Sequence, residues 1–300
     1  MTRADRRSVL TGLGAIALGG CDRPPASPGS EIRQTPGAWE VDLSALETAN
    51  GGRIGLCADD GNMASWRAHE RFNYCSTFKA FLATATLERV QRGEERLDRA
   101  IPVTAADIVF HAPVTEPAVG STLTIEQLCK AIVEVSDNPG ANILIRELGG
   151  IDAFRAWYRS IGDQSTTVDR LEPTMNRKDG DKDTITPSQA VANLGQVFGS
   201  VAVRPRLEEP MLARLRGWMI DSPTGANRIK AGVPAGWTVA HKTGTGGTGQ
   251  TNDIGVIQPP SGDPVRIAVY YEAPSGLSAD RRDAVIAEAA RLALKRLGHD

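Results

Sequence analysis

The chain contains 300 residues, of which 41% are hydrophobic, and it carries a formal net charge of −2 with a pI near 6.1. This length and apolar content can bury the core of one large domain or of two intertwined domains. Because Lys and Arg are scattered over a nearly neutral chain, the composition excludes nucleic acid as a partner, which would require a basic surface.

The four cysteines stand at positions 21, 57, 75 and 129, and no two of them form a CxxC pair. This spacing argues against a zinc cage or a redox motif, so the sequence predicts neither a metal nor another cofactor. The four histidines are interpreted as surface or rim residues rather than as ligands.

The first 21 residues are typical of a secretory signal. Arg3, Arg6 and Arg7 precede an apolar run at positions 9–18 that is too short to span a bilayer, and small residues follow before Cys21. The paired arginines weakly favour the twin-arginine export route. The Leu-Gly-Gly-Cys end resembles a bacterial lipobox, which would place a lipid on Cys21, and ordinary cleavage with release is the alternative. We therefore expect an exported, periplasmic protein, with a lipid anchor to the membrane as the favoured form.

Residues 22–37 are rich in Pro, Gly and Ser, which predicts a flexible tether before a folded domain at 38–300. In that domain, apolar spacing of three and four residues predicts helices, and alternation between turn signals predicts strands. In chain order, helices are expected at 39–51, 78–90, 124–134, 142–148, 152–161, 188–198, 211–220 and 279–297, and strands at 53–59, 64–69, 237–243, 252–258 and 265–272.

Strands at both ends of the domain around a helical middle predict an α+β fold. One antiparallel sheet with flanking helices would come from about 38–70 and 221–300, and an all-helical region from about 71–220 would be inserted into it. The active site would lie in the cleft between the two. Residues 163–187 lack periodicity and are rich in charge, which predicts a long loop that is either functional or disordered.

Ser76 stands at the start of the predicted 78–90 helix, where free backbone N–H groups and the helix dipole favour negative charge on a bound oxygen. Lys79 is three residues further on and shares a helical face with Ser76. A hydroxyl beside an amine is the minimal activated serine nucleophile that works without histidine. For this pair alone, an N-cap serine with a solvated lysine is the alternative, so the rest of the chain must decide.

Two further stretches lie where a serine–lysine hydrolase would need them. A Ser-Asp-Asn motif at 136–138 follows the predicted 124–134 helix, and Lys-Thr-Gly-Thr at 242–245 ends a predicted strand. The lysine of the second stretch supplies positive charge for an anionic substrate, and its threonines offer hydroxyl donors. Each stretch alone is consistent with a helix cap or a hairpin turn, but their order and spacing together favour catalysis.

Taken together, these motifs resemble those of the class A serine β-lactamases, which share them with the penicillin-binding proteins. The resemblance covers roughly residues 38–297. It includes Arg-Leu-Glu-Pro-Thr-Met-Asn at 170–176, which is similar to the family's characteristic loop, and Asp183 would close that loop through a salt bridge from Arg170. The resemblance implies hydrolysis of β-lactam antibiotics through a serine acyl-enzyme, and with it resistance to these antibiotics.

The resemblance implies the following catalytic roles. Ser76 would attack the lactam carbonyl and give its proton to Lys79 or, through a water, to Glu172, and the choice between the two stays open. Backbone N–H groups of Ser76 and Thr245 would form the oxyanion hole. Ser136 would relay a proton to the leaving nitrogen.

The resemblance also implies the residues that hold the substrate. Asn138 would bind the side-chain amide, and Glu172 and Asn176 would position the water that releases the acyl group. Many family members place an arginine where this chain has Thr251, and others supply it from the position of Arg228, for which a surface role is the alternative. The residues expected to receive the ring carboxylate are Lys242, Thr243, Thr245 and Arg228.

Several positions depart from the family pattern. Cys129 matches one half of a common disulfide, but Ala83 stands at the partner position, so that bridge is expected to be absent. Cys75 precedes the nucleophile, yet Gly246 stands where some carbapenem-hydrolysing relatives have its partner cysteine.

Two histidines replace other residues of the family pattern. His111 stands in place of the usual rim tyrosine, and His241 precedes the Lys-Thr-Gly stretch where Asp is more usual. These changes leave the preference among penicillins, cephalosporins and carbapenems open.

Two other functions share parts of the pattern. A D-alanyl-D-alanine carboxypeptidase or other penicillin-binding protein would share the three motifs but would not be expected to carry Glu172 and Asn176. A membrane-tethered β-lactam sensor would be acylated without turning over. We expect a monomer whose partners are small-molecule β-lactams.

Overall fold

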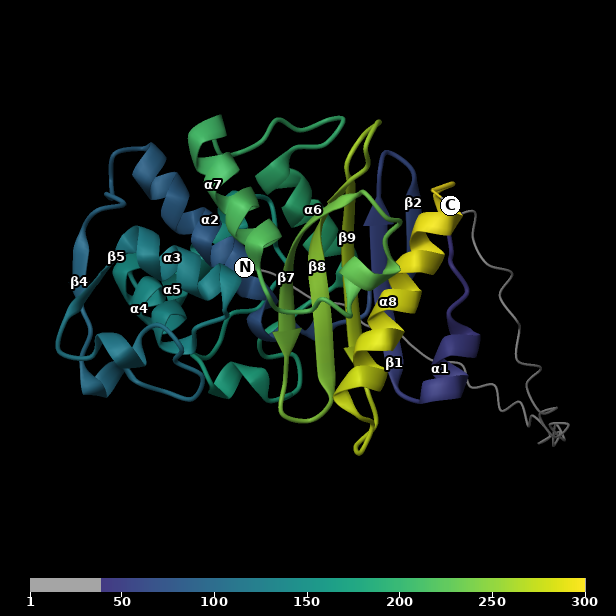
Figure 1. The fold of residues 1–300 in the computed structure, drawn as a ribbon, viewed down its shortest axis with the longest axis horizontal. Helices are drawn as coiled ribbons and strands as arrows, with labels where there is room; N and C mark the ends of the chain where they lie inside the picture. The colour runs from purple at the N-terminus through teal and green to yellow at the C-terminus, as the bar shows by residue number, and fades with distance from the viewer. Residues whose placement is uncertain (1–38, 300) are drawn as a thin grey trace, which may run out of the picture. The chain divides into compact units, whose positions relative to one another are not determined.

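The computed structural model describes residues 39–299, which form a five-stranded sheet with helices on both of its faces (Figure 1). The predicted signal segment at 1–21, the tether at 22–37 and the lipid acceptor Cys21 lie outside the described residues. The predicted α+β class, with one antiparallel sheet built from both ends of the domain, is confirmed.

The sheet joins segments that are far apart in the sequence. Its strands are β1 (Arg53–Asp59), β2 (Met63–Trp66), β7 (Thr238–Thr245), β8 (Gln250–Gln258) and β9 (Val265–Glu272), in the spatial order β2-β1-β9-β8-β7. β1 pairs with β9 along its whole length, so the first and last strands of the chain lie side by side in the middle of the sheet. β7, which carries the Lys-Thr-Gly-Thr stretch, is an edge strand.

One face of the sheet is covered by α8 (Ala279–Arg296), with α1 (Ser44–Asn50) beside it, and Figure 1 shows α8 crossing in front of the strands. α8 begins at the N-cap Ser278, whose hydroxyl accepts a hydrogen bond from the Arg281 N–H at 3.3 Å. Its buried residues recur at three- and four-residue steps and pack against the apolar side chains of β1 and β9. The amphipathic helix predicted at 279–297 is therefore confirmed, one residue shorter at its end.

The other face is covered by the helical region inserted between β2 and β7. Its helices are α2 (Phe78–Gln91), α3 (Ile125–Glu134), α4 (Asn138–Leu148), α5 (Ile151–Ser160), α6 (Pro187–Phe198) and α7 (Glu209–Asp221). α6 packs against β1, β8 and β9, and α7 packs against β7. Short elements complete this region: β3 (Phe72–Asn73) paired with β6 (Thr184–Ile185), β4 (Ala100–Pro102) paired with β5 (Thr122–Thr124), and the 3-10 turns η1 (Cys75–Thr77), η2 (Ala105–Asp107), η3 (Glu116–Ala118) and η4 (Thr174–Asn176).

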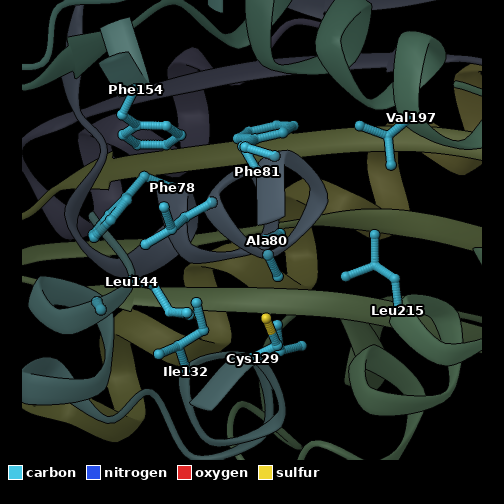
Figure 2. Close-up of a cluster of buried hydrophobic side chains, with 14 of the residues drawn as sticks. Phe78, Ala80, Phe81, Cys129, Ile132, Leu144, Phe154, Val197 and Leu215 are labelled. Carbon is cyan, nitrogen blue, oxygen red and sulfur yellow. The ribbon is translucent and has the colours of Figure 1, made fainter. Parts of the chain in front are cut away.

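α2 runs through the centre of the helical region. Every residue from Phe78 to Glu88 is buried, so this helix is enclosed on all sides rather than on one stripe. Figure 2 shows Phe78 and Phe81 of α2 with Phe154 of α5 and Ile132 of α3 in one cluster of apolar side chains. This packing holds the start of α2, and with it Ser76, in a rigid surrounding.

Several predicted boundaries differ from the structure. The helix expected from position 39 begins only at Ser44, because Trp39 and Val41 instead bond through their backbones to Ser65 of β2, at 2.9 Å in both cases. The strand expected at 64–69 ends at Trp66, since Arg67 adopts a positive φ of 46° and opens a turn.

The helix expected from position 142 starts at Asn138. The Asp137 carboxylate caps it by accepting the Gly140 N–H at 2.8 Å, and Pro139 lies in its first turn. Pro is favourable there because its missing N–H has no partner within the helix in any case.

Residues 163–187 form an ordered loop. The predicted salt bridge is present, since Arg170 Nε lies 2.5 Å from Asp183 Oδ2, and Asp183 is fully buried. The Asn73 side chain of β3 donates to the carbonyl oxygens of Met175 at 2.9 Å and Asp183 at 3.0 Å. The loop is therefore fastened at its base and at its middle, and the disordered alternative is wrong.

The interpretation of all four histidines as surface or rim residues is wrong for His241, which is fully buried in β7. Cys57, Cys75 and Cys129 are free and buried, as the missing partner positions predicted for the latter two. Within residues 39–299, no helix combines the length and the apolar character that a membrane crossing requires.

Candidate active site

Ser76 lies in the turn η1, directly before α2. The turn is shaped by Cys75, which has a positive φ of 47°, and by Thr77, whose hydroxyl donates to the Tyr74 carbonyl at 2.8 Å. Ser76 is only 7% exposed, and its side chain lines a pocket. The expected position of this serine before the first turn of a helix is therefore found.

Lys79 and Glu172 meet beside Ser76. Lys79 Nζ lies 3.0 Å from Glu172 Oε1, and the side chains of both residues have no exposed surface. The Ser76 hydroxyl lies 3.4 Å from the same carboxylate oxygen. A nucleophile candidate, an amine and a carboxylate thus converge, and the side chains of the two charged residues are shielded from bulk water.

The Ser-Asp-Asn motif borders Lys79 on the side of α4. Lys79 Nζ donates to the Ser136 carbonyl at 2.8 Å and to Asn138 Oδ1 at 2.5 Å, and it lies 3.4 Å from the Ser136 hydroxyl. The Asp137 carboxylate is fully buried and turns inward to bind the backbone N–H groups of Val114, Thr115 and Gly140. This anchoring projects the side chains on either side of Asp137 into the site.

Glu172 is held in place by two asparagines. The Asn176 amide donates to Glu172 Oε2, whereas Lys79 contacts Oε1. Both oxygens of the Glu172 carboxylate therefore have a partner. Asn142 of α4 accepts the Glu172 N–H at 3.0 Å and donates to the Glu172 carbonyl at 2.9 Å. Sequence reasoning missed Asn142, because thirty positions separate it from Glu172 and no local pattern marks the contact.

β7 supplies the opposite wall of the site. Lys242 Nζ donates to the Ser136 hydroxyl at 3.1 Å and to the Thr243 carbonyl at 2.9 Å, so the Ser136 hydroxyl lies between the two lysines. Thr243 and Thr245 line the pocket. A Cβ at Gly244 would lie 2.8 Å from the Tyr74 carbonyl, so only glycine allows β7 to approach η1 this closely.

Arg228 lies just before the turn η5 (Ile229–Gly232) and is 9% exposed. Its Nη1 donates to two backbone carbonyls, those of Gly244 at 3.0 Å and Asn252 at 2.9 Å, and its Nη2 donates to the Thr245 hydroxyl at 2.9 Å. Asp283 of α8 binds its Nε at 2.8 Å. The guanidinium is thus built into the edge of β7 and is not a surface group.

The pocket between these walls has a volume of about 550 Å³. Phe110 and His111 form part of its rim, and Phe110 is 81% exposed. His111 Nε2 lies 2.8 Å from the Val135 carbonyl, which holds the imidazole over the start of the Ser-Asp-Asn motif. The rim position expected for His111 is therefore found. The side chains that line the pocket are those of Ser76, Phe110, His111, Ser136, Asn138, Pro173, Asn176, Arg177, Thr224, Arg228, Thr243 and Thr245.

Burial changes the proton affinity of both lysines. It lowers the pKa of Lys79, although the charge and hydrogen bond of Glu172 oppose this effect. Burial lowers the pKa of Lys242 well below its usual range, to which the charges of Lys79 and Arg228 add, whereas Asp253 and Glu172 oppose it. A less basic amine is closer to the condition in which it can accept a proton at neutral pH.

All ten residues predicted for the site are brought together around this one pocket. Seven of them line it, and Lys79, Lys242 and Glu172 lie directly behind the lining through their contacts with Ser76 and Ser136. Over the described range 39–299, no group of His, Cys, Asp and Glu side chains is arranged to hold a metal ion. The arrangement can activate a serine hydroxyl, receive an anion and place a water beside a carboxylate.

Known proteins that are similar to this chain are β-lactamases. The β-lactamase enzyme family matches residues 38–297. β-Lactamase AST-1 of Nocardia asteroides is 37% identical over 99% of this chain and 97% of its own length, and β-lactamase FAR-1 of Nocardia farcinica is 35% identical over the same shares.

Solved structures show the same fold. An ancestral class A β-lactamase is 44% identical with a TM-score of 0.79, covering 84% of this chain and 97% of its own. A β-lactamase from Xanthomonas campestris pv. campestris is 38% identical with a TM-score of 0.80, covering 85% and 96%. The chain belongs to the class A β-lactamase family.

Proposed function

We propose that this protein hydrolyses β-lactam antibiotics through an acyl-enzyme on Ser76 and thereby confers resistance to them. The observation that carries the proposal is the convergence of Ser76, Lys79 and Glu172, in which one carboxylate oxygen lies 3.0 Å from the amine and 3.4 Å from the hydroxyl. Family membership supports the same reaction, since the relatives are named β-lactamases.

In the first step, the Ser76 oxygen bonds to the lactam carbonyl carbon. The hydroxyl proton passes to Lys79 or, through a water, to Glu172, whose Oε1 lies 3.4 Å from the hydroxyl and 3.0 Å from the Lys79 amine. The backbone N–H groups of Ser76 and Thr245 would stabilise the negative oxygen of the tetrahedral intermediate, each by about 3 kcal/mol in comparable sites.

The ring C–N bond then breaks and the nitrogen takes a proton from Ser136. The Ser136 hydroxyl suits this relay because it lies 3.4 Å from Lys79 Nζ and 3.1 Å from Lys242 Nζ, so a lysine can restore its proton. Asn138, which contacts Lys79 at 2.5 Å, would hold the amide of the substrate side chain.

Lys242, Thr243, Thr245 and Arg228 would receive the ring carboxylate. Arg228 supports this role because its Nη2 already binds the Thr245 hydroxyl, which places positive charge at the mouth of the pocket. A charge-assisted hydrogen bond to a carboxylate is roughly twice as strong as a neutral one.

Water completes the cycle. Glu172 and Asn176, which are bound to each other, would orient a water molecule and remove its proton as it attacks the acyl ester. The ester C–O bond breaks, Ser76 recovers its proton, and the opened product leaves. This step separates a hydrolase from a protein that β-lactams only acylate.

The location of the enzyme is part of the same proposal. The sequence of the first 21 residues supports export to the periplasm, where β-lactams act, and Cys21 would carry a lipid anchor. An intact mass of the exported protein that lacks any lipid would exclude the anchor without affecting the proposed reaction.

Hydrolysis of a chromogenic cephalosporin tests the proposed function. We expect rapid multiple turnover by the wild type and none by Ser76→Ala. A stable acyl adduct on the wild type would favour the sensor, and release of D-alanine from a D-alanyl-D-alanine peptide without cephalosporin turnover would favour the carboxypeptidase.

A further inference from the structure

Besides the exposed Arg177, three cationic side chains border the pocket, and two of these three have a carboxylate partner. Lys79 is paired with Glu172 at 3.0 Å, and Arg228 is paired with Asp283 at 2.8 Å. Among the ion pairs within residues 39–299, none joins Lys242 to a carboxylate. The third cation therefore needs another source of negative charge.

Lys242 is fully buried, so bulk water does not stabilise the charge of its ammonium group. Its amine bonds to two neutral acceptors, the Ser136 hydroxyl at 3.1 Å and the Thr243 carbonyl at 2.9 Å. Removing an ammonium group from water without a counter-charge disfavours its protonated form. A neutral Lys242 could not attract a substrate carboxylate.

A buried carboxylate lies behind the strand that carries Lys242. Asp253 of β8 is fully buried and stands opposite Thr243 in the β7–β8 pairing, one position from Lys242. Its Oδ2 accepts the Ile229 N–H at 3.2 Å, and both of its oxygens lie within 3.0 Å of His241 Nδ1. The charge of Asp253 opposes the lowering of the Lys242 pKa.

The surroundings of His241 indicate that its imidazole is neutral. His241 Nδ1 faces the carboxylate of Asp253, whereas Nε2 is buried and has no hydrogen-bond partner. A protonated imidazole would leave a charged N–H unsatisfied at Nε2, which costs more than leaving a neutral nitrogen there. A neutral ring with its proton on Nδ1 donates to Asp253, so the pair keeps one net negative charge.

We propose that Asp253, held by neutral His241, is a positioning residue that keeps Lys242 protonated from behind β7 and so maintains the receptor for the substrate carboxylate. This inference rests on the role given to Lys242 in the proposed function. It adds that negative charge reaches Lys242 from the far side of the strand as well as from Glu172 on the pocket side.

Other charged groups face these residues. Lys79, Arg228 and Glu172 act on Lys242 from the pocket side. Lys230 of η5 also lies in the field of Asp253 and of Asp221 at the end of α7. Lys230 Nζ bonds to the carbonyls of Ile220 and Ser222, so it does not pair directly with Asp253.

The pH dependence of kcat/KM for an anionic cephalosporin tests the proposal. At high pH the value should fall as Lys242 loses its proton, and Asp253→Asn should move this fall to lower pH by about one unit, since a nearby opposite charge shifts a pKa by roughly one to three units. His241→Asn is the matched control. Its amide can still donate to Asp253, so the pH at which kcat/KM falls should not change. An unmoved fall in Asp253→Asn, or an equal movement in His241→Asn, would overturn the proposal.

Repeating the Asp253→Asn substitution in a Lys242→Arg variant identifies the residue whose loss of a proton causes the fall in kcat/KM. Arginine does not lose its proton in this range, so in Lys242→Arg the substitution Asp253→Asn should no longer move the fall. A movement of the same size in that background would assign the effect to Lys79 and contradict the proposal. If Lys242→Ala leaves kcat/KM unchanged, the role of Lys242 in the proposed function fails instead.

A measurement on the wild type covers the case in which the Asp253 variant does not fold. Nitrogen NMR of the His241 imidazole should show the neutral ring with its proton on Nδ1 under the conditions of the activity assay. A protonated ring there would cancel the charge of Asp253 and overturn the proposal.

Discussion

Replacing Arg170 by alanine should loosen the loop that carries Glu172. The Asp183 carboxylate is fully buried, and Arg170 Nε lies 2.5 Å from its Oδ2. Its Oδ1 accepts the backbone N–H groups of Asp169 at 2.8 Å and of Arg170 at 3.1 Å. Arg170→Ala removes the only cation paired with Asp183 among the described residues and keeps the two backbone donors.

Breaking a buried ion pair from one side costs about 3–5 kcal/mol, because the remaining charge is left uncompensated. The Arg170 side chain is 18% exposed and the backbone donors remain, so we expect the lower end, about 3 kcal/mol. In a domain of this size that loss lowers the melting temperature by roughly 6–12 °C.

Equilibrium unfolding in urea measures the loss, and Lys182→Ala is its control. Lys182 pairs with Asp179 at 2.7 Å, but both side chains are 54% exposed, so removing this solvent-screened pair should cost far less than removing the buried one. Burst kinetics on Arg170→Ala should show deacylation slowed more than acylation, because Ser76 and Lys79 do not belong to the loop. A cost no greater than that of Lys182→Ala would refute this reasoning.

Three further predictions follow from single side chains. Arg228→Ala should raise the KM for anionic β-lactams about 10-fold or more with a smaller change in kcat, and an unchanged KM would exclude its carboxylate role. Burial raises the pKa of Cys57 and Cys129 to about 12, so a thiol reagent at about pH 8 should modify them only after unfolding. Burial alone would raise the pKa of Glu272, but Arg53 and Lys178 hold it below its ordinary value. Its contribution to stability is therefore present above about pH 4.3 and lost as the pH falls further, so Glu272→Gln should show a shallower loss of unfolding free energy between about pH 5 and pH 3.

The parts of the site that are close together in the sequence were predictable. Helical spacing places Ser76 and Lys79 on one face. Alternation along β7 directs the Lys242 side chain to the opposite face of the sheet from its two neighbours on the strand. Resemblance to a family supplied Glu172 and Arg228, for which no local pattern exists. The antiparallel sheet was predictable because strands with turn signals occur at both ends of the domain.

The contacts that fasten the site were not predictable. Asn142 binds the backbone of Glu172, and Asn73 binds the loop from β3, across separations that periodicity does not report. His241 is buried because the turn at Gly225 covers its ring. A Cβ at Gly225 would lie only 3.1 Å from that ring. A polar residue in an edge strand is read as exposed unless the covering segment is known.

The central claim is that Glu172 makes the acylated serine turn over, and the mass of Glu172→Ala after mixing with a β-lactam tests it most directly. We predict a lasting adduct on Ser76 equal to the whole antibiotic, while the wild type returns to its free mass within the same time and Ser76→Ala gains none. Unchanged steady-state turnover of Glu172→Ala, with no adduct, would contradict the account.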